Sequence, residues 1–163
     1  MALERRGTLR ALVTQNIDGL HQLAGHSPSK IVEVHGTMRD VMCMACGWRG
    51  PARPVLERVR SGEADPACAA CGGILKSATI SFGQPLVPEV IAAAIRAAEE
   101  ADLLLAIGTS LQVYPVASLV PLAKAAGARV VIVNAEPTPF DQIADAVIRS
   151  PIGDALTQII AAE

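Results

Sequence analysis

Four cysteines fall into two pairs of the form Cys-x-x-Cys, and a glycine follows each pair directly. The pairs are Cys43 with Cys46 and Cys68 with Cys71. This spacing is typical of a zinc ribbon, in which tight turns aim four thiolates at one tetrahedral Zn²⁺ ion. Four sulfur ligands leave no open coordination position, so we expect the zinc to be structural. Redox-active dithiols or unliganded thiols are less favoured, because neither pair begins a helix that follows a strand.

The segment VEVHG, shortly before the first cysteine pair, contains one histidine, His35, followed by Gly36. Since the four cysteines already complete a zinc shell, His35 needs another explanation. A lone histidine is more often a surface or packing residue than a catalyst. However, His35 follows an expected strand and precedes Gly36, a residue type that lets a ligand approach the backbone, which favours a role as an acid or base. Both interpretations stay open on the spacing alone.

Polar residues also follow three expected strands, in the segments TQNID, GTS and NAE. In open α/β sheets, ligands bind at the carboxyl ends of strands. Asn and Asp in the first segment suit ribose or amide groups, the second suits phosphate, and Asn134 and Glu136 in the third suit an adenosine ribose. Each segment alone is more often a turn or a helix cap.

The hydrophobic pattern predicts the elements that must position these residues. Strands are expected within 9–19, 30–36, 103–110, 128–136 and 145–148, and helices over 88–102, 115–127 and 154–163, with Pro121 as a potential kink. Between about Met38 and Lys76 the pattern fades around the cysteines and the short polar segment ERVRSGEAD. We therefore predict an α/β fold: a partial Rossmann-like parallel sheet over 1–38 and 77–163, with an inserted four-cysteine zinc-ribbon module over 39–76.

Composition narrows the function further. The 163 residues suit about one domain, and 14 Lys plus Arg against 16 Asp plus Glu give a net charge of −2, which disfavours nucleic acid and anionic membranes as partners. The hydrophobic share is 51% and the aromatic share 2%, as expected for buried parallel strands rich in Ala, Val, Ile and Leu. With no membrane span and no signal-peptide core, we expect a cytoplasmic protein.

Taken in order, several segments together resemble the sirtuins, the NAD-dependent protein deacylases. They are TQNIDGLHQLAG, VEVHG, CMACG, CAACGGIL, ISFG, ADLLLAIGTSLQVYP and VVIVNAEPT, and the resemblance runs from about Leu9 to Leu156. It implies NAD and Zn²⁺ as cofactors and an acyl-lysine protein or peptide as substrate. The implied chemistry is attack of the acyl oxygen on the nicotinamide ribose, then attack by the 2′-hydroxyl, giving nicotinamide, free lysine and O-acyl-ADP-ribose. No oligomeric state follows from it.

The resemblance also implies a role for each matching residue. His35 corresponds to the general base, with Asn16 and Asp18 as further catalytic positions, and the four cysteines correspond to the zinc ligands. The substrate peptide is expected to lie as an added strand between Phe82 with Gly83 on one edge and Val113 on the other. The implied NAD-binding residues are Gln15, Asn16, Ile17, Asp18, Gly108, Thr109, Ser110, Asn134, Ala135, Glu136 and Ile152.

Two departures from the family pattern leave alternatives open. The family begins with a strand and a GAGxS-type loop, which these residues do not include, so we expect impaired activity from a fragment, a mis-started chain or a reduced protein. The segment FGQPLVP also differs from the commoner FGE. A non-catalytic module that binds NAD, ADP-ribose or a protein is the alternative function. A nucleic-acid-binding zinc ribbon ranks last, because the module's only aromatic residue is Trp48 and its charges are mixed.

Overall fold

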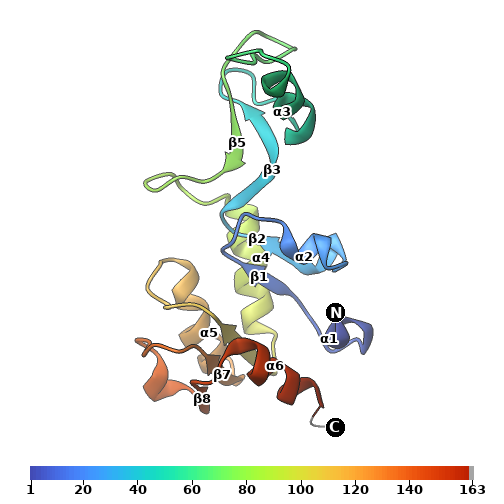
Figure 1. Cartoon of the computed structure of the whole chain (residues 1–163). Coiled ribbons are helices and arrows are strands. Elements are labelled where there is room, and N and C mark those ends of the chain that lie inside the picture. The colour runs from blue at the N-terminus through green and yellow to red at the C-terminus, as the bar shows by residue number, and fades with distance from the viewer. Residues whose placement is uncertain (162–163) are drawn as a thin grey trace. The chain divides into compact units, whose positions relative to one another are not determined.

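The computed structural model describes residues 1–161 and divides the chain into two compact units (Figure 1). Within the described residues, the first unit comprises 1–12 and 88–161, and the second comprises Val13–Val87. The predicted zinc-binding segment, 39–76, lies within the second unit. Its predicted boundaries stay a prediction, since the antiparallel sheet around the cysteines extends beyond both of them.

A parallel sheet forms the centre of the first unit. Its strands are β6 (Leu103–Ile107), β7 (Arg129–Val133) and β8 (Ala146–Ile148), in the order β6-β7-β8. The central strand β7 carries the most deeply buried side chains, Val130, Ile132 and Val133, each fully excluded from solvent. The run of Val and Ile in β7 suits a strand covered on both faces. These strands confirm the predicted α/β class.

Helices accompany this sheet: α1 (Ala2–Arg5), α4 (Pro88–Glu99), α5 (Leu119–Ala125) and α6 (Ile152–Ala161). Helix α4 follows its predicted stripe, because Ala94 and Ala98 are buried while Arg96 is exposed. Helix α6 confirms the predicted C-terminal helix as far as Ala161, and residues 162–163 lie outside the described part of the chain.

The predicted helix over 115–127 is not continuous. A 3-10 helix, η2 (Val116–Ser118), precedes α5, which places Pro121 at the third position of the α-helix. Proline lacks an amide hydrogen, so it is tolerated only in the first turn, where amides have no intrahelical partner. The chain therefore starts a new helix just before Pro121. The helix ends before Gly127, whose φ of +100° suits glycine.

The second unit contains two small sheets. Strands β1 (Leu12–Thr14) and β2 (Ile31–Glu33) form one, although Leu12 itself belongs to the first unit. The short helices α2 (Leu20–Leu23) and η1 (Pro28–Lys30) lie between these strands in the sequence. Strands β3 (Gly36–Cys43), β4 (Arg49–Pro51) and β5 (Leu75–Thr79) form an antiparallel sheet in the order β4-β3-β5. The strands predicted at the TQNID and VEVHG segments are confirmed as β1 and β2.

Helix α3 (Ala52–Arg60) was not predicted, because the hydrophobic pattern fades in this part of the sequence. The helix packs against β3 and buries Ala52, while its other side chains are mostly exposed. Arg53 donates to Glu57 one turn later at 2.9 Å, a helical pair that supports this polar surface. Packing of this narrow face against β3 thus decides that the segment is helical.

Among residues 1–161, no helix combines the length and apolar character needed to cross a bilayer.

Candidate metal centre and nucleotide-binding residues

The four cysteine side chains converge on one point of the second unit. Their sulfur atoms all lie within 4.8 Å of one another, with 3.5 Å between Cys43 and Cys71 and 3.9 Å between Cys46 and Cys68. Four sulfurs around one Zn²⁺, each at about 2.3 Å, would be separated by about 3.8 Å. The arrangement therefore fits a tetrahedral tetrathiolate site, as the spacing predicted.

Two similar turns hold the cysteine pairs. The amide of Gly47 donates to the Cys43 carbonyl at 3.1 Å, and the amide of Gly72 donates to the Cys68 carbonyl at 2.8 Å. Both glycines have a positive φ, +71° and +73°, which explains why glycine follows each pair. Each turn directs two sulfurs to the same side of the backbone.

The thiol groups are electrostatically unequal without a cation. Amide donation from Cys46, with further help from Ala45, outweighs burial and lowers the pKa of Cys43 to about 6. For Cys71, the Gly73 amide lowers the pKa, but contacts with the Cys46 and Cys43 sulfurs and burial together raise it to about 12. Like-charged sulfurs cannot all ionise side by side unless a positive ion neutralises them. Zn²⁺ supplies that charge.

Sequence reasoning missed Gly73, which packs directly against the cluster. A Cβ atom at this position would lie 2.9 Å from the Cys43 sulfur and 2.8 Å from the Ala45 Cβ. The Gly73 amide also donates to the Cys71 sulfur at 3.4 Å. The doubled glycine in CAACGG was a signal for this close approach, since only one glycine is needed for the turn.

His35 lies in the turn between β2 and β3. Its neighbour Val34 is almost fully buried and donates its amide to the Thr14 carbonyl at 3.1 Å, which joins this turn to the end of β1. Gly36 has a φ of +74°, and a Cβ there would lie 2.2 Å from the Ala78 carbonyl oxygen. The backbone at His35 is thus held on both sides. Within residues 1–161 no group bonds to its half-buried imidazole.

The loop after β1 lies beside the His35 turn. Met38 donates its amide to the Ile17 carbonyl at 2.9 Å, so β3 fastens the loop. The Asp18 carboxylate accepts from the Leu20 amide at 2.9 Å, at the start of α2, and therefore also serves as a helix cap. Asn16 is exposed. The structure brings this loop and His35 together, while the catalytic roles of these residues stay predictions.

Phe82 and Gly83 form an exposed turn after β5. The Phe82 side chain is fully exposed, and the turn is closed by Gln84, whose amide donates to the Ser81 carbonyl and whose side-chain oxygen accepts from the Ser81 amide at 2.9 Å. Gln84 occupies the position where the family more often has glutamate. An amide oxygen accepts the same hydrogen bonds, so this departure is compatible with the turn.

In the first unit, the GTS segment follows β6. The Gly108 amide donates to the Val133 carbonyl at 2.9 Å, and its φ is +60°. A Cβ at Gly108 would lie 2.9 Å from Ile152 Cδ1, so two predicted nucleotide-binding residues are in contact. Thr109 accepts from the Leu111 amide at 3.2 Å, Ser110 is exposed, and Val113 is 41% exposed.

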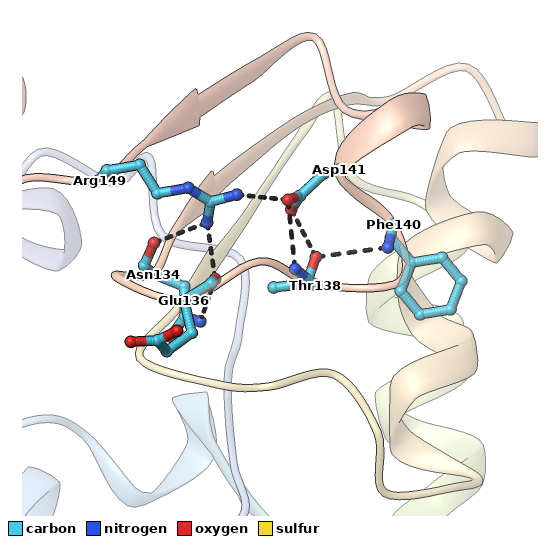
Figure 2. Close-up of polar contacts among 6 residues, drawn as sticks. All are labelled: Asn134, Glu136, Thr138, Phe140, Asp141 and Arg149. Carbon is cyan, nitrogen blue, oxygen red and sulfur yellow. Dashed lines mark hydrogen bonds and ion pairs between the residues drawn. The ribbon is translucent and has the colours of Figure 1, made fainter.

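The NAE segment follows β7 in the same unit and is fixed by groups that sequence reasoning did not single out. The Asn134 side chain donates to the Glu136 carbonyl at 2.8 Å, and Arg149 donates to carbonyls of this segment (Figure 2). Ala135 and Glu136 are exposed. The signal that could have revealed the supporting network is the Thr-x-x-Asp spacing of Thr138 and Asp141, which is typical of a reciprocal cap.

These features define an α/β protein with a parallel sheet of nucleotide-binding type and a four-cysteine metal site. The family model described as the Sir2 family matches residues 1–115. The chain therefore belongs to the Sir2 family, as the resemblance predicted.

Individual relatives agree with this assignment. "NAD-dependent protein deacetylase 2" of Streptomyces coelicolor is 53% identical over 158 residues, 97% of this chain and 66% of the relative. "NAD-dependent protein deacetylase" of Sulfurisphaera tokodaii is 43% identical over 97% of this chain and 61% of its own length. A Sir2 structure with p53 peptide and NAD+ has a TM-score of 0.90 and 32% identity, covering 98% of this chain and 65% of that one. The chain thus spans about two thirds or less of these relatives.

Proposed function

We propose that this protein is an NAD-dependent protein-lysine deacetylase of the sirtuin type, which releases nicotinamide and forms O-acyl-ADP-ribose. The observation that carries the proposal is the 53% identity, across 97% of this chain, to a protein named as an NAD-dependent protein deacetylase. The chain spans 66% of that relative, so the activity is inferred for the part that the two share.

His35 is the proposed general base. Its imidazole is half-buried, has no bonding partner within residues 1–161, and is carried by a backbone turn that Gly36 and Val34 hold in place. A histidine near neutral pH can accept a proton from a ribose hydroxyl, which prepares that oxygen for attack on the acyl carbon. The Gln15–Asp18 loop beside the turn is proposed to contact the nicotinamide ribose.

The first unit supplies the proposed nucleotide-binding groups. The exposed Ser110 hydroxyl and the backbone after β6 suit phosphate, Glu136 suits the hydroxyls of a ribose, and Ile152 offers an apolar contact for a base. NAD, when bound, supplies an electrophilic ribose carbon with nicotinamide as the leaving group. These side chains hold and orient the nucleotide and take no proton.

The proposed substrate is an acyl-lysine side chain on a protein or peptide. Phe82 of the second unit and, separately, Val113 of the first are exposed apolar side chains, and neither lies in a strand of the described residues 1–161. Addition of a peptide as a strand uses backbone hydrogen bonds, which make little demand on the substrate sequence. The zinc site is proposed to be structural, and the four free thiols fit a reducing compartment, which supports a cytoplasmic location.

The test is nicotinamide release from NAD by the zinc-loaded protein, measured with and without an acetyl-lysine peptide. We expect peptide-dependent release. We expect His35→Ala to reduce the steady-state formation of deacetylated peptide and O-acyl-ADP-ribose by at least about 100-fold, within the range that a general base contributes, because His35 acts after nicotinamide has left. Zinc content and ADP-ribose binding should be unchanged in this variant. Binding of ADP-ribose without any nicotinamide release would instead support a non-catalytic nucleotide-binding module.

A further inference from the structure

The segment Asn134–Thr138 connects β7 to the 3-10 helix η3 (Asp141–Ile143) and carries the proposed ribose-binding residues. Its first amide, on Asn134, donates to the carbonyl of Ile148, the last residue of β8, at 3.1 Å, so the start of the segment is hydrogen-bonded to the end of β8. Beyond that point, none of the strands within residues 1–161 pairs with it. Backbone carbonyls in such a segment need donors from elsewhere, and the direction in which its side chains point depends on which donors bind them.

Arg149, directly after β8, supplies those donors. Its Nη1 atom donates to the Asn134 carbonyl at 2.8 Å and to the Glu136 carbonyl at 2.7 Å. Its Nη2 atom forms an ion pair with the Asp141 carboxylate. One guanidinium therefore joins both ends of the NAE segment to the start of η3, as Figure 2 shows. We call this set of contacts the Arg149 bridge.

The Asp141 carboxylate, which accepts the ion pair from Arg149, is itself held in place by Thr138. The Thr138 hydroxyl donates to one oxygen of Asp141 at 2.7 Å, and the Thr138 amide donates to the other at 3.2 Å. These bonds, followed by the contact with Arg149, lower the pKa of Asp141 despite partial burial. The side chains of Arg149 and Asp141 are only 38% and 23% exposed. Thr138 thus orients the carboxylate, and Thr138 and Arg149 together favour its charged form.

We propose that Arg149 is a positioning residue, which holds the Asn134–Thr138 segment in the conformation that presents Asn134 and Glu136 to the ribose of an adenine nucleotide. The inference rests on the proposed function for its ligand. Arginine suits the role because its planar fork spans three acceptors in two directions, whereas the single ammonium of lysine cannot. If the segment is ordered only a tenth of the time without the bridge, nucleotide affinity falls about tenfold.

The experiment compares Arg149→Met, Arg149→Lys, Asp141→Asn and the double variant Arg149→Met/Asp141→Asn with the wild-type protein and a matched control. The control is Lys124→Met, which breaks another ion pair of the same unit, Lys124 with Asp145, at 2.7 Å and 37% and 38% exposure. The measurements are the dissociation constant of ADP-ribose by calorimetry, amide hydrogen exchange of residues 134–138 without ligand, and the steady-state constants KM and kcat for NAD and peptide. Exchange of β7 amides reports whether each variant remains folded.

We expect Arg149→Met to weaken ADP-ribose binding about tenfold and to accelerate exchange over 134–138, with β7 unchanged. Arg149→Lys should restore little of the ADP-ribose affinity, because a single charge does not replace the planar guanidinium. Adding Asp141→Asn to Arg149→Met should weaken binding little further, since both substitutions break the same Arg149 bridge. In turnover assays the KM for NAD should rise, while kcat and the KM for peptide stay near wild type. Lys124→Met should match the wild type in ADP-ribose affinity, in exchange of residues 134–138 and in these kinetic constants.

Two contrary results are distinguishable. Equal ADP-ribose binding and equal exchange in wild type and Arg149→Met would overturn the bridge and leave the proposed function intact. Failure of the wild-type protein to bind ADP-ribose would contradict the proposed function and remove the ligand assigned to this segment. A full rescue by Arg149→Lys would also overturn the proposal, because it would reduce the role of Arg149 to its charge.

Discussion

Individual side chains in this protein combine a local structural role with a proposed chemical one. Asp18 accepts a hydrogen bond from the Leu20 amide at the start of α2 and is also a proposed catalytic residue. A structural role as a helix cap and a proposed role in catalysis are therefore compatible in this residue. Within residues 1–161 no group bonds to the other carboxylate oxygen, so that oxygen can accept a hydrogen bond from a ligand. Gly36 likewise fits close to the Ala78 carbonyl and fixes the turn that carries His35.

Gly73 provides a test at the scale of one methyl group. Because a Cβ there would lie 2.9 and 3.2 Å from the Cys43 and Cys71 sulfurs, Gly73→Ala should displace the thiolates and weaken zinc binding by about 10- to 100-fold. Competition for zinc with a chromophoric chelator measures the affinity of each variant. Gly153→Ala is the control, since a Cβ at Gly153 meets nothing within 4 Å. Unchanged zinc affinity in Gly73→Ala would contradict the prediction and show that the cysteine turns can shift to accommodate a methyl group.

At the scale of elements, ion pairs fasten the connections around β7 and β8. The Asp145 carboxylate, just before β8, accepts two contacts from Lys124 of α5, at 2.8 and 2.7 Å, and one from the Val130 amide of β7 at 2.7 Å. The ion pair with Lys124, then the Val130 amide, lower the pKa of Asp145 despite partial burial. Three elements of the first unit therefore meet at one carboxylate.

This network predicts a pH dependence with a definite sign. A carboxylate whose pKa is lower in the folded state stabilises the fold above its unfolded pKa, about 3.9, and loses that contribution as the pH falls through the folded value. Asp145→Asn should therefore unfold at lower urea concentration than wild type at pH 7, and the difference should shrink by pH 3. Asp102→Asn, which alters an exposed carboxyl outside this network, should show no such convergence. A difference for Asp145→Asn that is independent of pH would contradict the assignment.

For the whole molecule, the chemistry is divided between two compact units. The four cysteines and His35 belong to Val13–Val87, whereas the proposed nucleotide groups after β6 and β7 belong to the unit built on the parallel sheet. No cysteine lies in the core of that sheet, whose buried cluster contains Ala106, Val130 and Ile132. The stability of the two units should therefore respond differently to the metal.

Removal of zinc should affect the two units unequally. Chelation under reducing conditions removes the ion that holds the turns at Cys43 and Cys68, so amides around both turns should exchange their hydrogens faster. Mass spectrometry measures this exchange. Amides of β7, in the other unit, should stay protected. Readdition of Zn²⁺ to the chelated protein is the control, and uniform loss of protection over both units would show that the metal supports the entire chain.

Much of this organisation follows from the sequence alone, because the signals are local. The Cys-x-x-Cys-Gly repeats determined a tetrathiolate site, hydrophobic runs determined the parallel strands, and the order of the motifs determined the family. The tertiary structure alone decided what depends on contacts between distant residues. The packing of α3 on β3 and the bonds of Arg149 to the carbonyls of Asn134 and Glu136 have no periodic pattern in the sequence, because each arises only when separate segments pack together. The second glycine of CAACGG hinted at a close approach, but only the folded structure shows that Gly73 lies against the Cys43 sulfur.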